Sequence, residues 1–295
     1  MKDTTADRIL VLGIYAFMIV LAVVMLYPFW EQVVLSFSTR AQALRDTLHL
    51  VPYPVSLEAY DRVLGSHEVW HAFLVTVFRV VVGTIFGLAV TAMTAYPLAR
   101  DDFPFRDIFL ALILFTMLFN GGLIPDYLLR KSLHLLNTLL VLILPGISAY
   151  NVIIIRSFYR YAIPRELQEA AQLDGASDWD VWWHVVLPLS KPVLATVGLW
   201  LAVSHWNAYF DALIYITDHD KYVLQVILRR ILLENQIEMF LPPGTARDIG
   251  AVGQPPTPET VKAALIVVST IPIVLIYPLL QRYFIKGITL GSLKG

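Results

Sequence analysis

Six long apolar runs constrain the fold of this 295-residue chain more than any other feature of its sequence. Each run has roughly 20 residues, the length that an α-helix needs to cross the hydrocarbon core of a bilayer. Hydrophobic residues make up 57% of the chain and charged residues only 15%, which is more apolar surface than a soluble core of this size buries. The sequence therefore predicts an all-α integral membrane protein, one transmembrane domain over residues 1–295, with spans at about 9–30, 71–97, 107–125, 137–156, 192–216 and 260–284.

The first run is interpreted as a retained span and not as a signal peptide. It is too long for a signal core and lacks a small-x-small cleavage pattern. Six spans put both termini on the same side of the membrane. Lys and Arg are slightly denser in the shorter loops on that side, as the positive-inside rule predicts for the cytoplasm, but the difference does not decide the orientation by itself.

One polar connection between spans, at about 157–191, is patterned as two short helices about a glycine. Pro164 suits the first position of a helix, and Gly175 suits the left-handed residue that closes it. Ser177 predicts a capping box at the start of the second helix. Pro188 disfavours helical geometry in the residue before it, so the second helix is expected to stop there.

This loop also carries a set of residues at fixed spacing: Glu169, Ala170, Ala171, Asp174, Gly175, Leu187 and Pro188. The set resembles the signature loop of bacterial ABC-importer permeases, and the alternative is an ordinary amphipathic connector. In that family the loop is cytoplasmic and docks into a cleft on the ATP-binding subunit, which the glutamate engages. The resemblance implies maltose-permease-type spans, a helix-turn-helix coupling loop at about 157–191, and cytoplasmic termini.

The resemblance runs nearly end to end, and the sequences at 276–287 and 291–295 resemble the carbohydrate-importing branch of the family. The region around Arg79, residues 121–125 and residues 277–281 resemble permeases for alginate or polygalacturonate fragments in particular. It implies a second homologous permease subunit, two ATP-binding subunits and an external solute-binding protein in the bacterial inner membrane. The sequence has no G-x-x-x-x-G-K-[ST] motif, so ATP and Mg²⁺ are expected on the partner subunits, with no cofactor or catalytic residue in this chain. A net charge of −1 gives no indication of nucleic-acid binding.

A set of polar and aromatic residues within or next to the spans predicts a substrate pathway. A buried charge in a span usually faces a cavity, and the alternative for the arginine of the second span is that it snorkels to the surface. Aromatic rings beside hydrogen-bonding groups suit a sugar, which stacks its C–H faces and pairs its hydroxyls; the alternative is an interfacial aromatic belt with polar contacts inside the bundle. The candidates are Arg79, Asn120, Trp206, Asn207, Tyr209 and Asp211. Trp206 and Tyr209 are three residues apart and Asn207 and Asp211 four apart, so each pair is expected to share a face of the fifth span.

Two other functions compete with this interpretation. His67-Glu68-Val69-Trp70-His71 matches the zinc-protease motif H-E-x-x-H, and Asp174 resembles a third ligand of an intramembrane protease. Three predicted spans separate these motifs, which puts them at opposite membrane faces and argues against one zinc site. A secondary transporter or channel subunit is the other alternative; such transporters often carry inverted repeats, and the sequence shows no convincing internal repeat.

Overall fold

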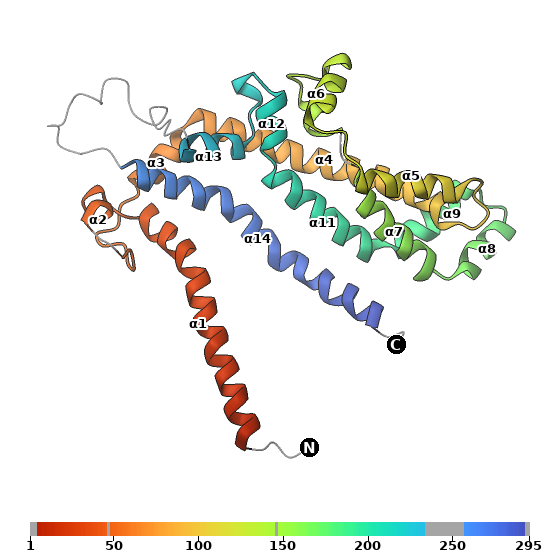
Figure 1. Ribbon diagram of the computed structural model, residues 1–295, viewed down its shortest axis with the longest axis horizontal. Helices are drawn as coiled ribbons and strands as arrows, with labels where there is room; N and C mark the ends of the chain where they lie inside the picture. Colours follow the sequence, from red (N-terminus) through yellow and green to blue (C-terminus); the bar gives the residue numbers. More distant parts are fainter. Residues whose placement is uncertain (1–4, 46–47, 145–146, 234–256, 293–295) are drawn as a thin grey trace. The chain divides into compact units, whose positions relative to one another are not determined.

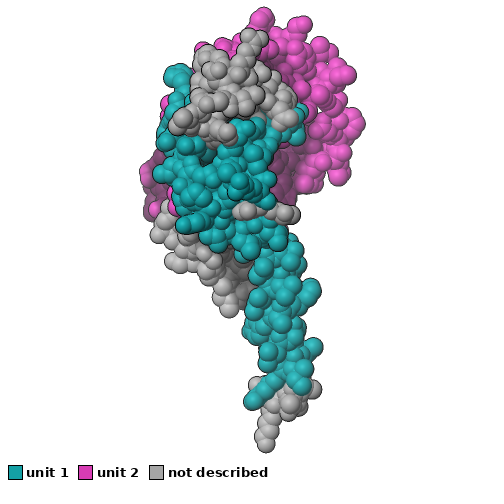
Figure 2. Space-filling model, turned by 90° about the vertical axis from the view of Figure 1, so that its left-hand side faces the viewer, with its two compact units in different colours: residues 1–70, 228–271 teal, residues 71–227, 272–295 magenta. Residues whose placement is uncertain are grey.

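The computed structural model describes residues 5–45, 48–144, 147–233 and 257–292, and helices form nearly all of the regular structure there (Figure 1). The described residues contain no strand and one isolated β-bridge, between Ser38 and Val55. The chain divides into two compact units, residues 1–70 with 228–271 and residues 71–227 with 272–295 (Figure 2). The single transmembrane domain over residues 1–295 stays a prediction.

The first unit contains the N-terminal helices and segments of three helices that continue into the second unit. Nearly every described side chain of the first helix from Arg8 to Trp30 is exposed in the isolated chain, as expected of a helix whose surroundings are lipid or another subunit. The elements are α1 (Thr5–Ser36), α2 (Arg40–Arg45), α3 (Glu58–Gly65), the start of α4 (His67–Ala99), the end of α13 (Leu224–Leu233) and the start of α14 (Pro258–Ser292).

The second unit contains the rest of these helices and all elements between α4 and α13. These are α5 (Arg106–Leu118), α6 (Leu123–Ser132), η1 (Leu139–Leu142), α7 (Ala149–Tyr161), α8 (Arg165–Leu173), α9 (Asp178–Val181), the π-helical turn η2 (Trp182–Val186), α10 (Leu187–Leu189), α11 (Lys191–Asn207), α12 (Phe210–Tyr215) and η3 (His219–Lys221).

One hydrophobic cluster holds α4, α7, α9, η2 and α11 together in this second unit. Its fully buried members are valine, isoleucine and alanine side chains, so that helices approach closely over a small-residue surface. The cluster consists of Ala92, Ala95, Leu98, Val152, Ile155, Tyr159, Ile163, Val181, Trp182, Val186, Val193, Val197 and Leu201.

The helices account for membrane spans as follows. Three of them are long and apolar enough to cross a bilayer by length and composition, in the ranges Arg8–Ser36, His67–Ala99 and Pro258–Ile276. Two bent pairs bring this to at most five: α5 with α6, bent by 118°, and Asp178–Leu189 with α11, bent by 80°. The third predicted span includes the bend between α5 and α6, the fourth is divided between η1 and α7, and the fifth between α11 and α12. The count of six spans remains a prediction.

Candidate functional site

The predicted coupling loop folds as two helices about a glycine. α8 ends at Leu173, and Gly175 takes the left-handed conformation with φ 88°. The Ala176 amide donates to the Ala171 carbonyl and the Gly175 amide donates to the Gln172 carbonyl, each at 3.0 Å. These two bonds form a Schellman motif, which satisfies carbonyls that the helix end leaves open. The predicted helix closure at Gly175 is confirmed.

The second helix of the loop begins with the predicted capping box. The Asp180 amide donates to Ser177 Oγ at 3.3 Å, and the Ser177 amide donates to Asp180 Oδ2 at 3.1 Å. The Ser177 bonds hold the pKa of the Asp180 carboxyl below its usual range. This cap fixes where the chain turns back into a helix, so the angle between α8 and α9 is specified by local sequence.

Two predictions about prolines in the loop are wrong. Pro164 is the N-cap of α8 and not its first helical residue. Pro188 does not stop the second helix, because the chain stays helical through α10 to Leu189 and turns only at Ser190. The wide π turn η2 immediately before Pro188 explains this: its hydrogen-bond register relieves the clash that a proline ring makes with an ordinary α-helical turn.

The two helices of the loop differ in burial. α8 has no buried residue, and Glu169 and Ala170 are exposed on it. Two leucines of this helix are also exposed, Leu167 at 47% and Leu173 at 89%. α8 is therefore open to contact with another subunit in the isolated chain.

The remaining residues of the predicted signature are partly buried or form the turn. Ala171 and Leu187 pack against the hydrophobic cluster of the second unit. Asp174 caps the end of α8. The signature thus combines an exposed face with residues that fix the position of that face.

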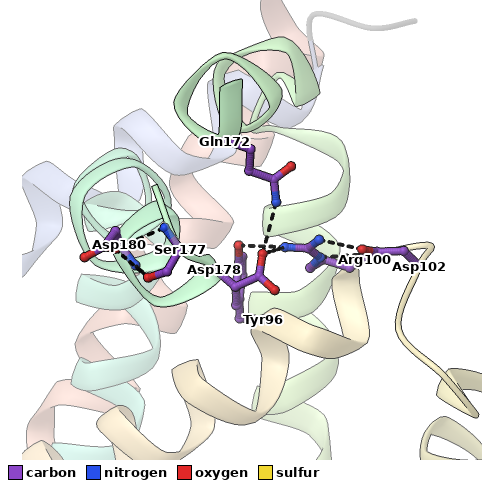
Figure 3. A network of polar contacts seen from close by, with 7 residues as sticks. All are labelled: Tyr96, Arg100, Asp102, Gln172, Ser177, Asp178 and Asp180. Carbon is purple, nitrogen blue, oxygen red and sulfur yellow. Dashed lines mark hydrogen bonds and ion pairs between the residues drawn. The ribbon is translucent and has the colours of Figure 1, made fainter. Parts of the chain in front are cut away.

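A network of arginines and aspartates, which the sequence interpretation missed, joins this loop to the end of α4 (Figure 3). Arg100 forms two bonds with the Asp102 carboxylate, Nε–Oδ1 measuring 2.8 Å, and an ion pair with Asp178 at the start of α9. Gln172 of α8 donates to the same Asp178 oxygen at 3.0 Å. The signal in the sequence was the charged triplet of residues 100–102 between two apolar runs.

A second node of the network is Asp101. Its carboxylate accepts from Arg160 of α7 at 2.9 Å and pairs with Arg165 of α8 and Arg106 of α5. Arg106 and Arg165 hold the pKa of Asp101 below its usual range, and Arg160 adds to the effect. Arg100 likewise lowers the pKa of the Asp102 carboxyl.

The direction of these shifts sets the pH range in which the network is ionised. A carboxyl whose pKa is lower in the folded protein contributes stability above its unfolded pKa of about 4. That contribution is lost only as the pH falls through the still lower folded pKa. The contacts of Asp101 and Asp102 therefore persist throughout the neutral range.

The predicted residues of the substrate pathway are only partly brought together. Arg79 is 3% exposed; it pairs with Asp211, whose Oδ1 lies 3.1 Å from Nη1, and it donates to the Ala208 carbonyl at 3.2 Å. α11 ends at Asn207 and Ala208 is extended, so its carbonyl lies outside the helical pattern and needs a donor. Arg79 is thus paired inside the protein, as a cation in a span is expected to be, and the snorkelling alternative does not describe it.

The predicted common helical face of Asn207 and Asp211 is wrong, because α11 and α12 break between these two residues. Asn207 instead donates to the Val203 carbonyl at 3.0 Å. Trp206 packs edge-on against Phe73, with ring centroids 6.0 Å apart. Trp206 and Asn207 line a separate, largely apolar cleft.

Two further predicted residues do not line the cleft that contains the Arg79–Asp211 pair. Tyr209 is 41% exposed at the break between α11 and α12. Asn120 lies in the turn between α5 and α6, where its Oδ1 accepts from the Gly122 amide at 2.8 Å.

The cleft beside the Arg79–Asp211 pair has a volume of about 530 Å³. It combines an aromatic pair, Tyr150 and Trp200 with centroids 6.1 Å apart, with polar groups that sequence reasoning missed, among them Asn151. These residues come from α7 and α11, and nothing in their spacing along the chain brings them together. Aromatic faces beside hydrogen-bonding groups are suited to a sugar.

No group of three or more His, Asp or Glu side chains able to hold a metal gathers anywhere in the part of the chain that the structure describes. That region includes His67, His71 and Asp174, the residues of the zinc alternative.

Comparison with known proteins agrees with this arrangement. A family model described as "Binding-protein-dependent transport system inner membrane component" matches residues 2–290. The chain is 39% identical to the polygalacturonan/rhamnogalacturonan transport system permease protein YtcP of Bacillus subtilis (strain 168), over 98% of this chain and 99% of that protein. It is also 39% identical to protein LplC of the same organism, over 100% and 98% of the two chains.

A solved structure of similar fold comes from a bacterial ABC transporter involved in the import of the acidic polysaccharide alginate. The TM-score is 0.88 and the identity 33%, over 95% of this chain and 98% of that chain. The match along almost the whole length covers the exposed coupling loop as well as the apolar helices. The chain therefore belongs to the binding-protein-dependent transport system inner membrane components, the multi-pass permease subunits of ABC importers, which are not themselves enzymes.

Proposed function

We propose that this chain is the permease subunit of an ATP-driven importer for acidic oligosaccharides, and that α8 is the element through which ATP hydrolysis acts on it. Family membership implies an ATPase and a solute-binding protein as partners. A second permease subunit and two ATPase subunits complete the proposed assembly. The observation that carries the coupling role is the exposure of α8, whose side chains remain unburied while those of α9 and η2 enter the core.

The proposed orientation follows from the partner. An ATPase works on the cytoplasmic side, so α8 lies there, and six spans then put both termini in the cytoplasm. ATP and Mg²⁺ are bound by the partner subunits, and this chain binds no cofactor of its own. Its contribution is mechanical: closure of the ATPase dimer displaces α8, and the helices attached to it switch between packings that open the cleft to one side or the other.

The proposed substrate is an oligomer of uronate sugars, such as fragments of pectin or alginate. The relatives' names support the acidic class, since one transports polygalacturonan and rhamnogalacturonan and the solved transporter imports alginate. The Tyr150–Trp200 pair offers apolar faces to the sugar rings. Because Asp211 already binds both Nη atoms of Arg79, a uronate carboxylate that approaches these atoms competes with Asp211 for them.

The coupling role is tested by Glu169→Lys in the assembled transporter. Glu169 is exposed and makes no contact that the fold depends on, so the variant is expected to fold and span the membrane normally. Uptake should fall by about tenfold or more while the ATPase retains activity, as loss of one buried charge pair at an interface predicts. Wild-type uptake by Glu169→Lys would contradict the coupling role.

The substrate class is tested separately in wild-type transporter. ATP-driven uptake of labelled galacturonate oligomers should be suppressed by an excess of unlabelled uronate oligomers and not by neutral maltooligosaccharides of equal length. Equal suppression by both would remove the acidic assignment and leave the permease role intact.

A further inference from the structure

The coupling loop and the C-terminal end of α4 are joined by side chains from both. At this end of α4 (His67–Ala99), Arg100 points between Asp102 of its own turn and Asp178 of the loop (Figure 3). Gln172 of α8 reaches the same Asp178 oxygen. One arginine thus connects the span to both helices of the loop, since Asp178 opens α9 and Gln172 lies on α8.

Asp101 forms the second connection, which reaches α8 directly through Arg165. α8 has no buried residue, and its first residue, Arg165, forms an ion pair with Asp101. Arg160 of α7 and Arg106 of α5 bind the same carboxylate. Three helices therefore meet on one side chain that directly follows α4. We call Arg100 and Asp101, with the partners just named, the α4 clamp.

The hydrophobic core beneath the α4 clamp prevents the loop from sliding over α4. Ala95 and Leu98 of α4 are buried in the same cluster as Val181 and Trp182 of the loop, all at 4% exposure or less. Close-packed side chains resist small displacements and favour movement as a body. Exposed ion pairs add little to overall stability, so the contribution of the clamp lies in fixing α8 to this body.

α4 carries such a movement directly to the cleft. It is one helix from Ala99 back to Arg79, a length of about 30 Å at 1.5 Å per residue. At that point Arg79 holds Asp211 and the Ala208 carbonyl, where α11 breaks. A displacement of the clamped end therefore changes the position of the side chain that closes one edge of the cleft.

We propose that Arg100 and Asp101 are positioning residues that transmit the movement of the coupling loop to α4, and that α4 conveys it to the Arg79–Asp211 contact. This inference rests on the proposed coupling role of α8. It assigns the α4–α5 turn, residues 100–105, a part in energy transmission alongside the loop itself.

The first test compares two aspartates in the assembled transporter, Asp101 of the α4–α5 turn and Asp107 at the start of α5. Asp101→Asn removes the carboxylate that joins α8 to α4, whereas Asp107→Asn removes one that contacts only Arg106, within α5. Both changes remove one charge. Uptake per ATP hydrolysed should fall by about fivefold or more in Asp101→Asn, as loss of a charge-assisted contact predicts, and stay at the wild-type level in Asp107→Asn. Unchanged coupling in Asp101→Asn would overturn the proposal.

The second test restores the connection covalently. The chain has no cysteine, so Arg100→Cys with Asp178→Cys gives one defined pair within it. Uptake per ATP should be low with free thiols and should recover when a short bifunctional thiol reagent links the two positions. Loss of uptake on cross-linking would show that the loop must separate from α4, which contradicts the proposal. If the Asp101→Asn transporter does not assemble, the cysteine pair tests the proposal by itself, because cross-linking keeps the loop attached to the end of α4.

The outcomes separate this inference from the proposed function. Failure of the wild-type chain to copurify with an ATPase would contradict the proposed function itself. A transporter that assembles, hydrolyses ATP and stays coupled without the α4 clamp would contradict only the role of Arg100 and Asp101.

Discussion

At the scale of single residues, the Arg79–Asp211 pair is the most consequential contact within the apolar part of the chain. An ionised side chain inside a span costs several kcal/mol unless it is paired, and Arg79 meets both a carboxylate and a freed backbone carbonyl. Breaking a buried pair is expensive because it leaves an uncompensated charge, whereas replacing both partners by apolar residues is often nearly neutral. The difference between the cost of removing one partner and the cost of replacing both distinguishes an arginine that stabilises the fold by pairing from one that binds substrate.

The corresponding prediction concerns Arg79→Leu alone and together with Asp211→Leu. The single variant leaves Asp211 without its cation and should destabilise the protein by roughly 3 kcal/mol, whereas the double variant should recover most of this loss. Thermal unfolding of both variants in detergent measures the difference.

A double variant no more stable than Arg79→Leu alone would mean that the two side chains do not stabilise each other. Uptake by the stable double variant then reports the substrate role of Arg79 free of the folding effect.

At this scale, sequence reasoning identified Arg79 and Asp211 but not their contact. A charge in an apolar run is visible in any sequence, and the expectation of a buried partner follows from its cost. The break at Ala208 is not visible, because residues 207–209 contain neither glycine nor proline. The interpretation therefore continued the helix and assigned Asn207 and Asp211 to one face.

At the scale of elements, α8 is the helix whose exposure most needs an explanation. Its C-terminus is closed by the Schellman motif at Gly175, and yet the helix has no buried residue in this chain. Leu173 is 89% exposed, close to the turn at Gly175. An isolated helix of this length is marginal in water, so partner contacts are expected to stabilise it.

Leu173→Asp should reduce the amount of ATPase that copurifies with the chain while leaving the fold unchanged. The leucine contributes no buried area to the isolated chain, so the change has little effect on its stability, but a charge opposes an apolar docking contact. The recovered ratio of ATPase to permease measures the effect, and a fall of about tenfold is expected for loss of an interface leucine.

Leu57→Asp is the matched control, because Leu57 is also exposed, at 57%, but lies in the segment before α3 that is predicted to be external. Equal losses in the two variants would indicate a general effect of charge and remove the docking role of α8.

Elements with strong local signals were predicted well. Gly175 and the Ser177 capping box specify their geometry through backbone chemistry alone, and both occur as expected. Pro188 has an equally strong local signal, but the π turn before it accommodates the ring and lets the helix continue. The α4 clamp escaped prediction because its charges come from one turn and from the ends of several helices that are distant in sequence.

At the scale of the whole molecule, the central claim is that this chain moves acidic oligosaccharides only as part of an ATPase-driven assembly. The chain has apolar helices, a cleft and the exposed helix α8, and its family membership implies ATPase and solute-binding partners. A self-sufficient transporter, a channel or a protease would need no such partner. The composition of the purified protein therefore tests the claim most directly.

The decisive measurement is gentle detergent extraction of the tagged chain, identification of the chains that copurify, and assay of the preparation for ATP hydrolysis. We predict an ATP-binding subunit and a second, homologous permease, with ATPase activity that the solute-binding protein and a uronate oligomer stimulate. A chain that purifies alone and transports without ATP, or one that holds zinc and cleaves peptides, would contradict the account.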